Sequence, residues 1–290
     1  MQTLLSASAA LVLTLVLAAE AQGNYVVTDL RGGYAYGLNA SGQVVGQNAA
    51  GHAFLYSNGT TTDLGTLGGS SSFALNINDA AQIVGWADSA GNTTSGFLDT
   101  NGSMVDLSPG SVSGGAQGIN ASGQVVGWYS NSGTTATGAP LGPTQPFLFS
   151  NQILTNLGTF PAGSDTYPLC INTSGQVVGY TYQPGITGEQ PFVISNGATT
   201  IVNISGAFQS VNVSGQVVGG HYFSDTVWHA ISYTNGAPTD LGTLGGSNSW
   251  AYGINSAGLI VGDAYTASGA DHAFLYSSRT PYNVLYNALS

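Results

Sequence analysis

The sequence predicts an all-β fold, a β-propeller of six four-stranded blades. The first observation is a motif of Asn, two residues, Gly and then Gln-Val-Val-Gly, which occurs four times in full and twice in a looser form, at intervals of 39 to 52 residues. Regular self-similarity of this length is typical of repeat architectures. The second is the run of turn signals between short apolar stretches. The third is the pair of adjacent valines in the motif, which point to opposite faces of a strand and therefore predict a sheet buried on both sides. Blades stacked around an axis satisfy all three observations. A β-solenoid is the alternative, although its coils are usually shorter than this unit.

Each unit begins with a hairpin made by the motif itself. Asn at the first turn position and Gly at the fourth favour a type I turn, and the Gly can then take a left-handed conformation that joins two antiparallel strands. In one copy Ala81 replaces this Gly, so we expect a strained or different turn there. The six copies are Asn39–Gly46, Asn78–Gly85, Asn120–Gly127, Asn172–Gly179, Asn212–Gly219 and Asn255–Gly262.

A second hairpin completes each unit. Asn-Gly pairs such as Asn58-Gly59 and Asn101-Gly102 indicate two-residue hairpin loops between the third and fourth strands. The segment Asp63–Gly69 follows, and it is repeated identically as Asp240–Gly246. The Asp of this segment is expected to cap a turn, and a ring of calcium ligands is the alternative.

The two ends of the chain suggest export and closure of the ring. Leu4 to Ala19 is an apolar run of about sixteen residues, shorter than the roughly twenty that span a bilayer. Together with the small residues around Glu20 it predicts a signal peptide over residues 1–21, with an uncleaved anchor as the alternative. Residues 22–290 then form a single six-repeat domain. Tyr25 to Leu30 matches the last strand of a unit and could complete the last blade.

The charge composition excludes several classes of partner. Only 5% of the residues are charged, the net charge is -11, and Arg31 and Arg279 are the only Lys or Arg residues. Nucleic acids and anionic lipid surfaces are recognised by clusters of Lys and Arg, so neither partner is expected. Cys170 is the single cysteine and is expected to be a small buried residue on a strand. We expect a secreted or cell-surface monomer.

The repeat resembles a known bacterial family. Its motifs are Ile-Asn-x-x-Gly-x-Val-Val-Gly, His-Ala-Phe-Leu and Asp-Leu-Gly-Thr-Leu-Gly-Gly, and they recur over residues 25 to 280. They resemble the probable extracellular repeat of the HAF family, which takes its name from the His-Ala-Phe seen at His52 and His272. The middle units depart from this pattern, because Phe147 and Phe192 follow proline. The resemblance implies an exported bacterial protein, and it brings no established reaction, ligand or functional residue.

No motif of a known reaction is present, and neither a metal nor another cofactor is expected. A nucleophile elbow, a zinc helix and a phosphate loop are all missing from the sequence. His52, His229 and His272 share one repeat position, which favours a structural role in hydrogen bonding. Only His221 breaks the repeat, and it lies near Asp225 in the sequence.

Function is expected on the variable segments between the second and third strands, which in a propeller emerge on one face. Aromatic residues occur near the starts of these segments, interleaved with Asn, Thr and Ser, and such a mixture complements a sugar. Packing between blades is the competing explanation. These observations favour a non-catalytic binding module for a glycan or a cell-envelope partner. The alternatives are a structural surface or matrix protein and, less favoured, a hydrolase or lyase that uses the central channel. The candidate ligand-binding residues are Trp86, Trp128, Tyr129, Tyr180, Tyr182, His221, Tyr222 and Tyr265.

Overall fold

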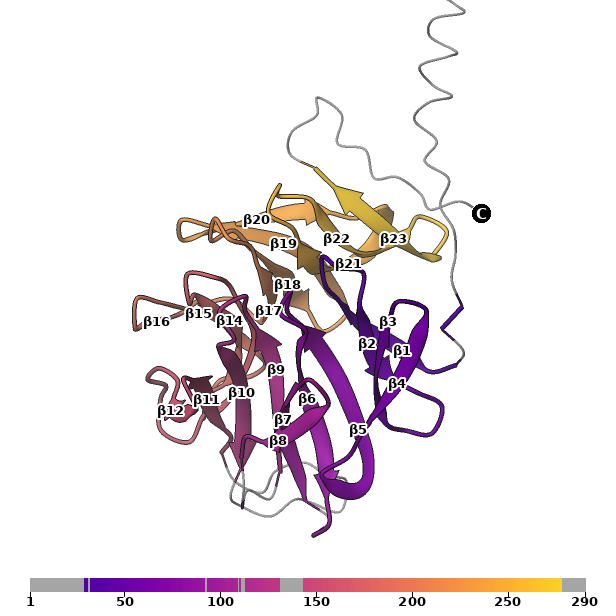
Figure 1. Cartoon of the computed structure of the whole chain (residues 1–290). Coiled ribbons are helices and arrows are strands. Elements are labelled where there is room, and N and C mark those ends of the chain that lie inside the picture. The colour runs from indigo at the N-terminus through magenta and orange to yellow at the C-terminus, as the bar shows by residue number, and fades with distance from the viewer. Residues whose placement is uncertain are drawn as a thin grey trace, which may run out of the picture. The chain divides into compact units, whose positions relative to one another are not determined.

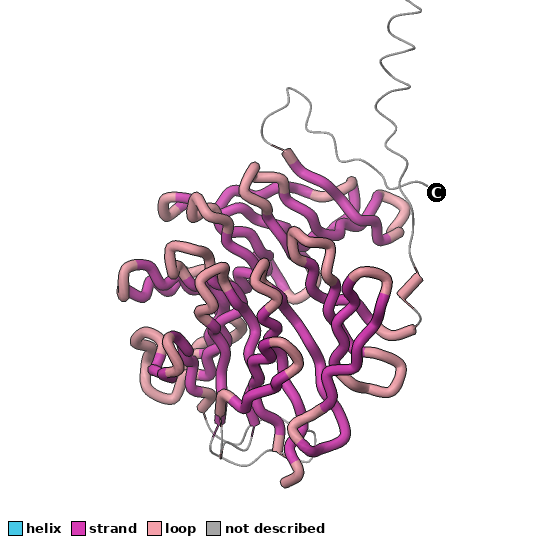
Figure 2. The backbone as a smooth tube through the Cα atoms, viewed as in Figure 1, coloured by secondary structure: helices cyan, strands magenta, loops and turns pink. Residues whose placement is uncertain are grey.

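The computed structural model describes residues 29–30, 32–91, 93–108, 110, 113–130 and 143–277. The chain from Gly33 onward forms one compact unit, and its described residues contain strands, turns and loops (Figure 2). No helix in the described ranges is long and apolar enough to cross a membrane. The signal peptide predicted over residues 1–21 lies outside the described residues and stays a prediction.

Six antiparallel sheets follow one another in chain order, and we number them as blades 1 to 6 (Figure 1). Blade 1 contains β1 (Tyr34–Leu38), β2 (Val44–Gln47), β3 (Ala53–Ser57) and β4 (Thr60–Gly65). Blade 2 contains β5 (Gly68–Ile77), β6 (Gln82–Ser89), β7 (Thr94–Thr100) and β8 (Ser103–Asp106). Blade 3 contains β9 (Ser113–Ile119), β10 (Val125–Ser130), β11 (Gln145–Ser150) and β12 (Ile153–Asn156).

The second half of the chain repeats this plan. Blade 4 contains β13 (Asp165–Ile171), β14 (Val177–Tyr182), β15 (Gln190–Ser195) and β16 (Ala198–Ile201). Blade 5 contains β17 (Gly206–Val211), β18 (Val217–Ser224), β19 (Val227–Thr234) and β20 (Ala237–Gly242). Blade 6 contains β21 (Gly245–Ile254), β22 (Ile260–Thr266) and β23 (Asp271–Tyr276).

The predicted six-bladed β-propeller is therefore confirmed. Five blades have four strands each, and blade 6 has three within the described part of the chain. The strand predicted to complete blade 6 begins at Tyr25, and residues 25–28 lie outside the described residues, so this closure stays a prediction. Because the strands of each blade run up and down, their connections alternate between two ends. We call the end with the Asn-x-x-Gly turns the turn face, and the end with the variable connections the loop face.

The asparagine of the motif shapes its own turn. In blade 3 the Oδ1 of Asn120 accepts hydrogen bonds from the backbone N–H groups of Ser122 and Gln124, both at 3.0 Å. The N–H of Gly123 bonds to the carbonyl of Asn120, and Gly123 has a left-handed φ of 74°. Ala81 makes the same turn in blade 2 with a φ of 59°. The strain predicted at Ala81 is thus confirmed, because a residue with a Cβ occupies the left-handed region there.

The same asparagines also connect neighbouring blades on the turn face. The Nδ2 of each of the first five asparagines donates a hydrogen bond to the backbone carbonyl of the corresponding asparagine in the next blade, and these five bonds run from Asn39 to Asn255 with lengths of 2.9 to 3.2 Å. All but Asn255 are buried. Buried amides are costly unless they are hydrogen-bonded, so this asparagine ladder fixes the spacing of the blades. Repetition in the sequence predicted the turn but not the ladder.

The last glycine of the motif is required by a close backbone approach. A bulge in the first strand of each blade brings a carbonyl oxygen over this glycine. A Cβ at Gly127 would lie 2.2 Å from the carbonyl oxygen of Gly115, and a Cβ at Gly85 would lie 1.8 Å from that of Phe73. No side chain fits at such a distance.

The apolar core lies between the blades. Five hydrophobic clusters are found among the described residues. Val125 belongs to one cluster and the adjacent Val126 to the next, and both side chains are fully buried. This alternation confirms the prediction of sheets buried on both faces for blades 2 to 5, whereas Val261 of blade 6 is 49% exposed. Cys170 packs against the fourth cluster and is partly buried, and burial raises the pKa of its thiol.

Candidate ligand-binding cavity on the loop face

A cavity of about 470 Å³ lies between blades 5 and 6 near the loop face, and we call it the aromatic cavity. This volume is in the range of small-molecule sites. Five of its lining residues carry aromatic rings, two are aspartates and one is a glutamine. They are Gln209, Tyr222, Trp228, Trp250, Tyr252, Asp263, Tyr265 and Asp271.

Blade 5 provides one wall through an extended hairpin. Strands β18 and β19 are joined by only two residues, Asp225 and Thr226, and each strand has eight residues. The additional ladder places Tyr222 opposite Trp228. The backbone N–H of Trp228 donates to the Oδ1 of the buried Asn248 of blade 6 at 3.1 Å. The short connection therefore carries two rings to the rim, and Asn248 anchors one of them.

Blade 6 provides the opposite wall through residues that share one face of its sheet. Asp263 and Tyr265 are two positions apart on β22, and Asp271 pairs with Tyr265 across the ladder. Trp250 pairs with Asp263 from the other side. Because alternate residues of a strand point to the same face, all four side chains face the cavity.

The ring of Trp250 lies over a glycine of blade 5. A Cβ at Gly220 would lie 2.1 Å from the Trp250 ring. The Trp250 ring is also 5.4 Å from the ring of Tyr222, measured between centroids. The absence of a side chain at Gly220 is thus what lets Trp250 reach toward the neighbouring blade.

The two carboxylates make the cavity acidic. The hydroxyl of Tyr252 donates to the Oδ2 of Asp263 at 3.0 Å. Burial raises the pKa of Asp263, the Tyr252 hydrogen bond lowers it, and the charge of Asp271 raises it further, with a net increase. Burial and the hydrogen bond to Asp263 raise the pKa of Tyr252 to about 12. The phenol therefore remains a hydrogen-bond donor at neutral pH.

A tyrosine cluster lies beside this cavity on blade 4. Tyr167 stacks on Tyr180 with centroids 5.2 Å apart, and Tyr182 contacts both rings. The Tyr182 hydroxyl donates to the Oε1 of Glu189 at 2.8 Å. Burial first, and then the negative charge of Glu189, raises the pKa of Tyr222, which connects the cluster to the cavity electrostatically.

The candidate residues predicted from sequence fall into three groups. Tyr222 and Tyr265 line the aromatic cavity, and Tyr180 and Tyr182 form the neighbouring cluster. Trp128 reaches this cluster by an edge contact with Tyr167 at 5.3 Å.

The remaining candidates lie elsewhere. Trp86 stacks on Phe73 within blade 2, with centroids 4.0 Å apart. Tyr129 points to the opposite face from Trp128 and packs against the core beside Phe147. His221 points away from Tyr222 and contacts the ring of Phe223 at 4.2 Å. The structure does not bring these three residues to the cavity.

Sequence reasoning missed most of the cavity because it searched only the starts of the variable segments. Trp228 follows such a segment, and Trp250 and Tyr252 belong to a first strand. One signal was available: the residue after the motif is Gly220 in blade 5, whereas the equivalent residues in blades 2 and 3 are Trp86 and Trp128. A missing side chain at a position of large rings indicates that a neighbour fills the space.

Repeated histidines and aspartates pair with each other in blades 1 and 5. His52 Nδ1 lies 3.1 Å from Asp63 Oδ2, and His229 Nδ1 lies 2.7 Å from Asp240 Oδ2. The other oxygen of each aspartate accepts the N–H of the residue two positions on, Gly65 or Gly242, at 2.7 Å. No group of three His, Cys, Asp or Glu residues in the described ranges could hold a metal ion.

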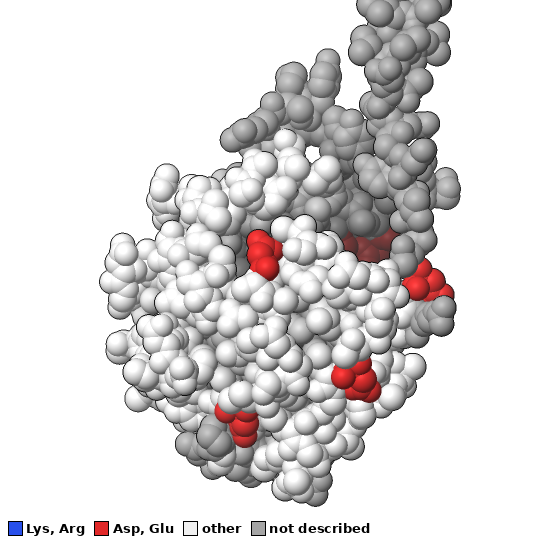
Figure 3. Space-filling view, in the orientation of Figure 1, with Lys and Arg blue, Asp and Glu red and all other residues white. Residues whose placement is uncertain are grey.

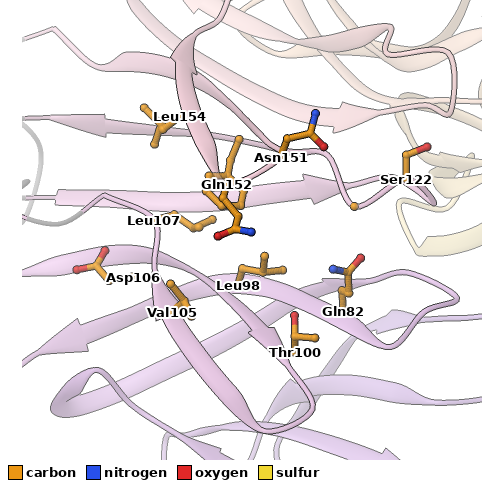
Figure 4. A pocket seen from close by; sticks show the side chains of 12 residues that line it. Gln82, Leu98, Thr100, Val105, Asp106, Leu107, Ser122, Asn151, Gln152 and Leu154 are labelled. Carbon is orange, nitrogen blue, oxygen red and sulfur yellow. The ribbon is translucent and has the colours of Figure 1, made fainter.

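A second, larger groove of about 690 Å³ lies between blades 2 and 3 near the turn face (Figure 4). Its lining mixes aliphatic side chains such as Leu98, Leu107 and Leu154 with polar ones such as Gln82 and Gln152, which Figure 4 labels. None of the sequence-predicted candidates lines it. Acidic residues are scattered over the face shown in Figure 3, without a concentrated patch.

The comparisons with known proteins identify the fold alone. No family model and no curated protein matches the sequence. The propeller domain of the Trilobed protease from Pyrococcus furiosus is similar with a TM-score of 0.58 and 9% identity, over 85% of this chain and 83% of that one. An acylaminoacyl peptidase from Pyrococcus horikoshii has a TM-score of 0.56 and 12% identity, over 84% of this chain and 44% of that one. A fucose-specific lectin from Aleuria aurantia has a TM-score of 0.45 and 11% identity, over 85% and 93% of the two chains.

Proposed function

We propose that this protein is a secreted or cell-surface binding module that recognises a carbohydrate, without catalysis, through the aromatic cavity. The observation that carries the proposal is the cavity lining of five rings, two carboxylates and one amide. A pyranose ring has apolar faces that stack on aromatic rings, and a belt of hydroxyls that bond to carboxylates and amides. The cavity offers both kinds of surface within one volume.

The arrangement of the cavity also supports recognition of a small ligand rather than a large partner. Its rings come from two blades that are held together by hydrogen bonds, from Trp228 to Asn248 and, fully buried, from Ala230 to Ser249. A rigid site reduces the entropy lost when a ligand is bound. The export part of the proposal rests on the apolar segment Leu4 to Ala19, which lies outside the described residues.

A broad glycan array, including envelope polysaccharides, tests this proposal. We expect binding that is lost in Trp228→Ala. This substitution removes an aromatic ring at the rim of the cavity, while the hydrogen bond from the N–H of Ala230 to Ser249, which joins the same two blades, remains. Trp86→Ala is the matched control, since Trp86 lies in blade 2 outside the cavity. Circular dichroism and thermal unfolding of both variants report whether each remains folded.

The outcomes separate the proposed sites and functions. Binding that is lost in Trp86→Ala but kept in Trp228→Ala would contradict the aromatic cavity as the site. If the wild-type protein binds no glycan on the array, this result would contradict carbohydrate recognition and favour a structural surface role.

One observation favours a hydrolase as a second candidate function. Asp263 and Asp271 are acids outside the repeat positions, and they line one cavity together. A pair of carboxyl groups is the usual catalytic equipment of glycoside hydrolysis. New reducing ends in a bound oligosaccharide, and their loss in Asp263→Asn, would establish this activity. Intact ligand after prolonged incubation would exclude it for that ligand.

A further inference from the structure

The charge of the aromatic cavity is more specific than recognition of a neutral sugar requires. Asp263 and Asp271 lie on the same face of blade 6, and none of the eight lining residues is basic. A neutral sugar needs hydrogen-bond acceptors, which Gln209 and the tyrosine hydroxyls already supply. The two carboxylates also repel each other, and no residue that lines the cavity compensates their negative charge.

The aromatic rings also favour a positively charged ligand. Each ring has a negative face, so a cation within about 6 Å of the centroid is attracted to it. The ring centroid of Tyr222 lies 6.4 Å from that of Trp228 and 5.4 Å from that of Trp250. A cationic group in this volume would therefore lie near aromatic rings of both blades and near the two carboxylates of blade 6.

No Lys or Arg occurs in the part of the chain that the structure describes, because Arg31 and Arg279 lie outside it. The whole chain has two Lys or Arg residues and a net charge of -11. Burial of Asp263 and the nearby charge of Asp271 raise the pKa of Asp263, and a bound cation would oppose this increase by stabilising the carboxylate. The favourable interaction with a cation thus adds to the stacking and hydrogen bonding that a sugar provides.

We propose that the aromatic cavity takes an amino sugar with a free, protonated amine, the ammonium lying among the rings and facing Asp263 and Asp271. This inference rests on the proposed carbohydrate-binding function and names the class of carbohydrate. The sugar ring would stack on the tryptophans, while the ammonium would donate hydrogen bonds to the carboxylates.

Three matched oligosaccharides test the inference. They are β-1,4-linked oligomers of glucosamine, N-acetylglucosamine and glucose of equal length, which differ only in the group at carbon 2. Calorimetric titration of the full protein should give at least about tenfold tighter binding of the glucosamine oligomer than of either neutral oligomer. Added salt should weaken the glucosamine oligomer most, because screening acts on charges.

Each result has a distinct meaning. Equal affinities for all three oligomers would overturn the amine preference and leave carbohydrate recognition standing. Binding of the neutral oligomers alone would do the same. Absence of binding for all three would overturn the inference and, together with a silent array, the proposed function.

Charge variants distinguish the cavity from general attraction to an acidic protein. The double variant Asp263→Asn, Asp271→Asn should lose the preference for the glucosamine oligomer, so that it binds the glucosamine and glucose oligomers with equal affinity. Asp79→Asn, Asp88→Asn is the control, since it removes the same charge from blade 2. If both double variants weaken the glucosamine oligomer equally, its binding is nonspecific and the inference is wrong. Thermal unfolding of both variants checks that they are folded.

Discussion

The junction between blades 1 and 2 and the junction between blades 5 and 6 are built on the same frame. The segment that leads into the second blade of each pair is identical, and β5 and β21 both have ten residues. In each junction a buried serine, Ser72 or Ser249, accepts the N–H of the alanine of the third strand and donates to the carbonyl of Gly65 or Gly242. Each also has the paired His and Asp described above.

The two junctions differ in the side chains at three equivalent positions, and the aromatic cavity lies at the second junction. Trp86 covers Phe73 in blade 2, whereas the equivalent pair in blade 6 is Asp263 and Trp250. At the third position Gln47 of blade 1 bonds to the carbonyl of Gly51 at 3.1 Å, and its equivalent in blade 5 is Gly220. A short carboxylate in place of a tryptophan leaves the Trp250 face uncovered. The frame is thus constant, and a few side chains at one register decide whether a junction contains a cavity.

The largest expected effect comes from Gly220→Gln, which gives blade 5 the residue of blade 1. Its Cβ would lie 2.1 Å from the Trp250 ring, so the ring must leave its position. We expect a loss of about 3 kcal/mol of unfolding free energy and loss of ligand binding. Urea denaturation measures the first and calorimetric titration the second.

The reciprocal substitution, Gln47→Gly, is the control for this prediction. It removes hydrogen bonds at the first junction and should cost about 1 kcal/mol without any change in binding. Equal binding by Gly220→Gln and the wild type would show that Trp250 does not shape the site.

A smaller effect is expected from the serine contacts that the two junctions share. Ser249→Ala and Ser72→Ala each leave a buried N–H and a carbonyl without their partner, at a cost of about 2 kcal/mol. Because the geometry is the same, the two losses measured by urea denaturation should agree within about 0.5 kcal/mol. A clearly larger loss in one variant would mean that the cavity changes how strongly these hydrogen bonds stabilise the junction.

The smallest effect is expected from Asp63→Asn at the first junction. Burial tends to raise the pKa of Asp63, but hydrogen bonds from Gly65, His52 and Asn48 outweigh it and lower the pKa below its ordinary value. A lowered folded-state pKa means that the carboxylate stabilises the protein above its ordinary value of 3.8, and that this contribution is lost as pH falls through the folded pKa. At neutral pH the substitution should cost less than about 1 kcal/mol, as for an exposed pair.

Urea denaturation at pH 7, 5 and 3 checks this prediction. The difference between Asp63→Asn and the wild type should shrink toward pH 3, because the wild-type carboxyl is then increasingly protonated. A difference that is constant over this range would show that the carboxylate charge contributes nothing.

The sequence predicted the scaffold well because its signals are local and repeated. Asn120 and Gly123 specify their turn within five residues, and Val125 and Val126 indicate a strand buried on both faces. Among the candidate site residues, Tyr222 and Tyr265 meet at the cavity, whereas Trp86, Tyr129 and His221 lie elsewhere. Whether such a residue faces the cavity depends on which side of its strand it occupies. The aromatic residues alone do not show how neighbouring strands pair, and this pairing sets the side.

The sequence by itself determined the blade number, the turns and the strands with two adjacent β-branched residues, because each depends on residues that are close in the chain and recur six times. Only the tertiary structure decided that Asn120 donates to the carbonyl of Asn172, that Gly220 lies beneath Trp250, and that Asp263 and Asp271 share a cavity with Trp228. The physical reason is that these contacts join different strands or blades. Their partners are set by how neighbouring sheets pack, which no periodicity within one unit specifies.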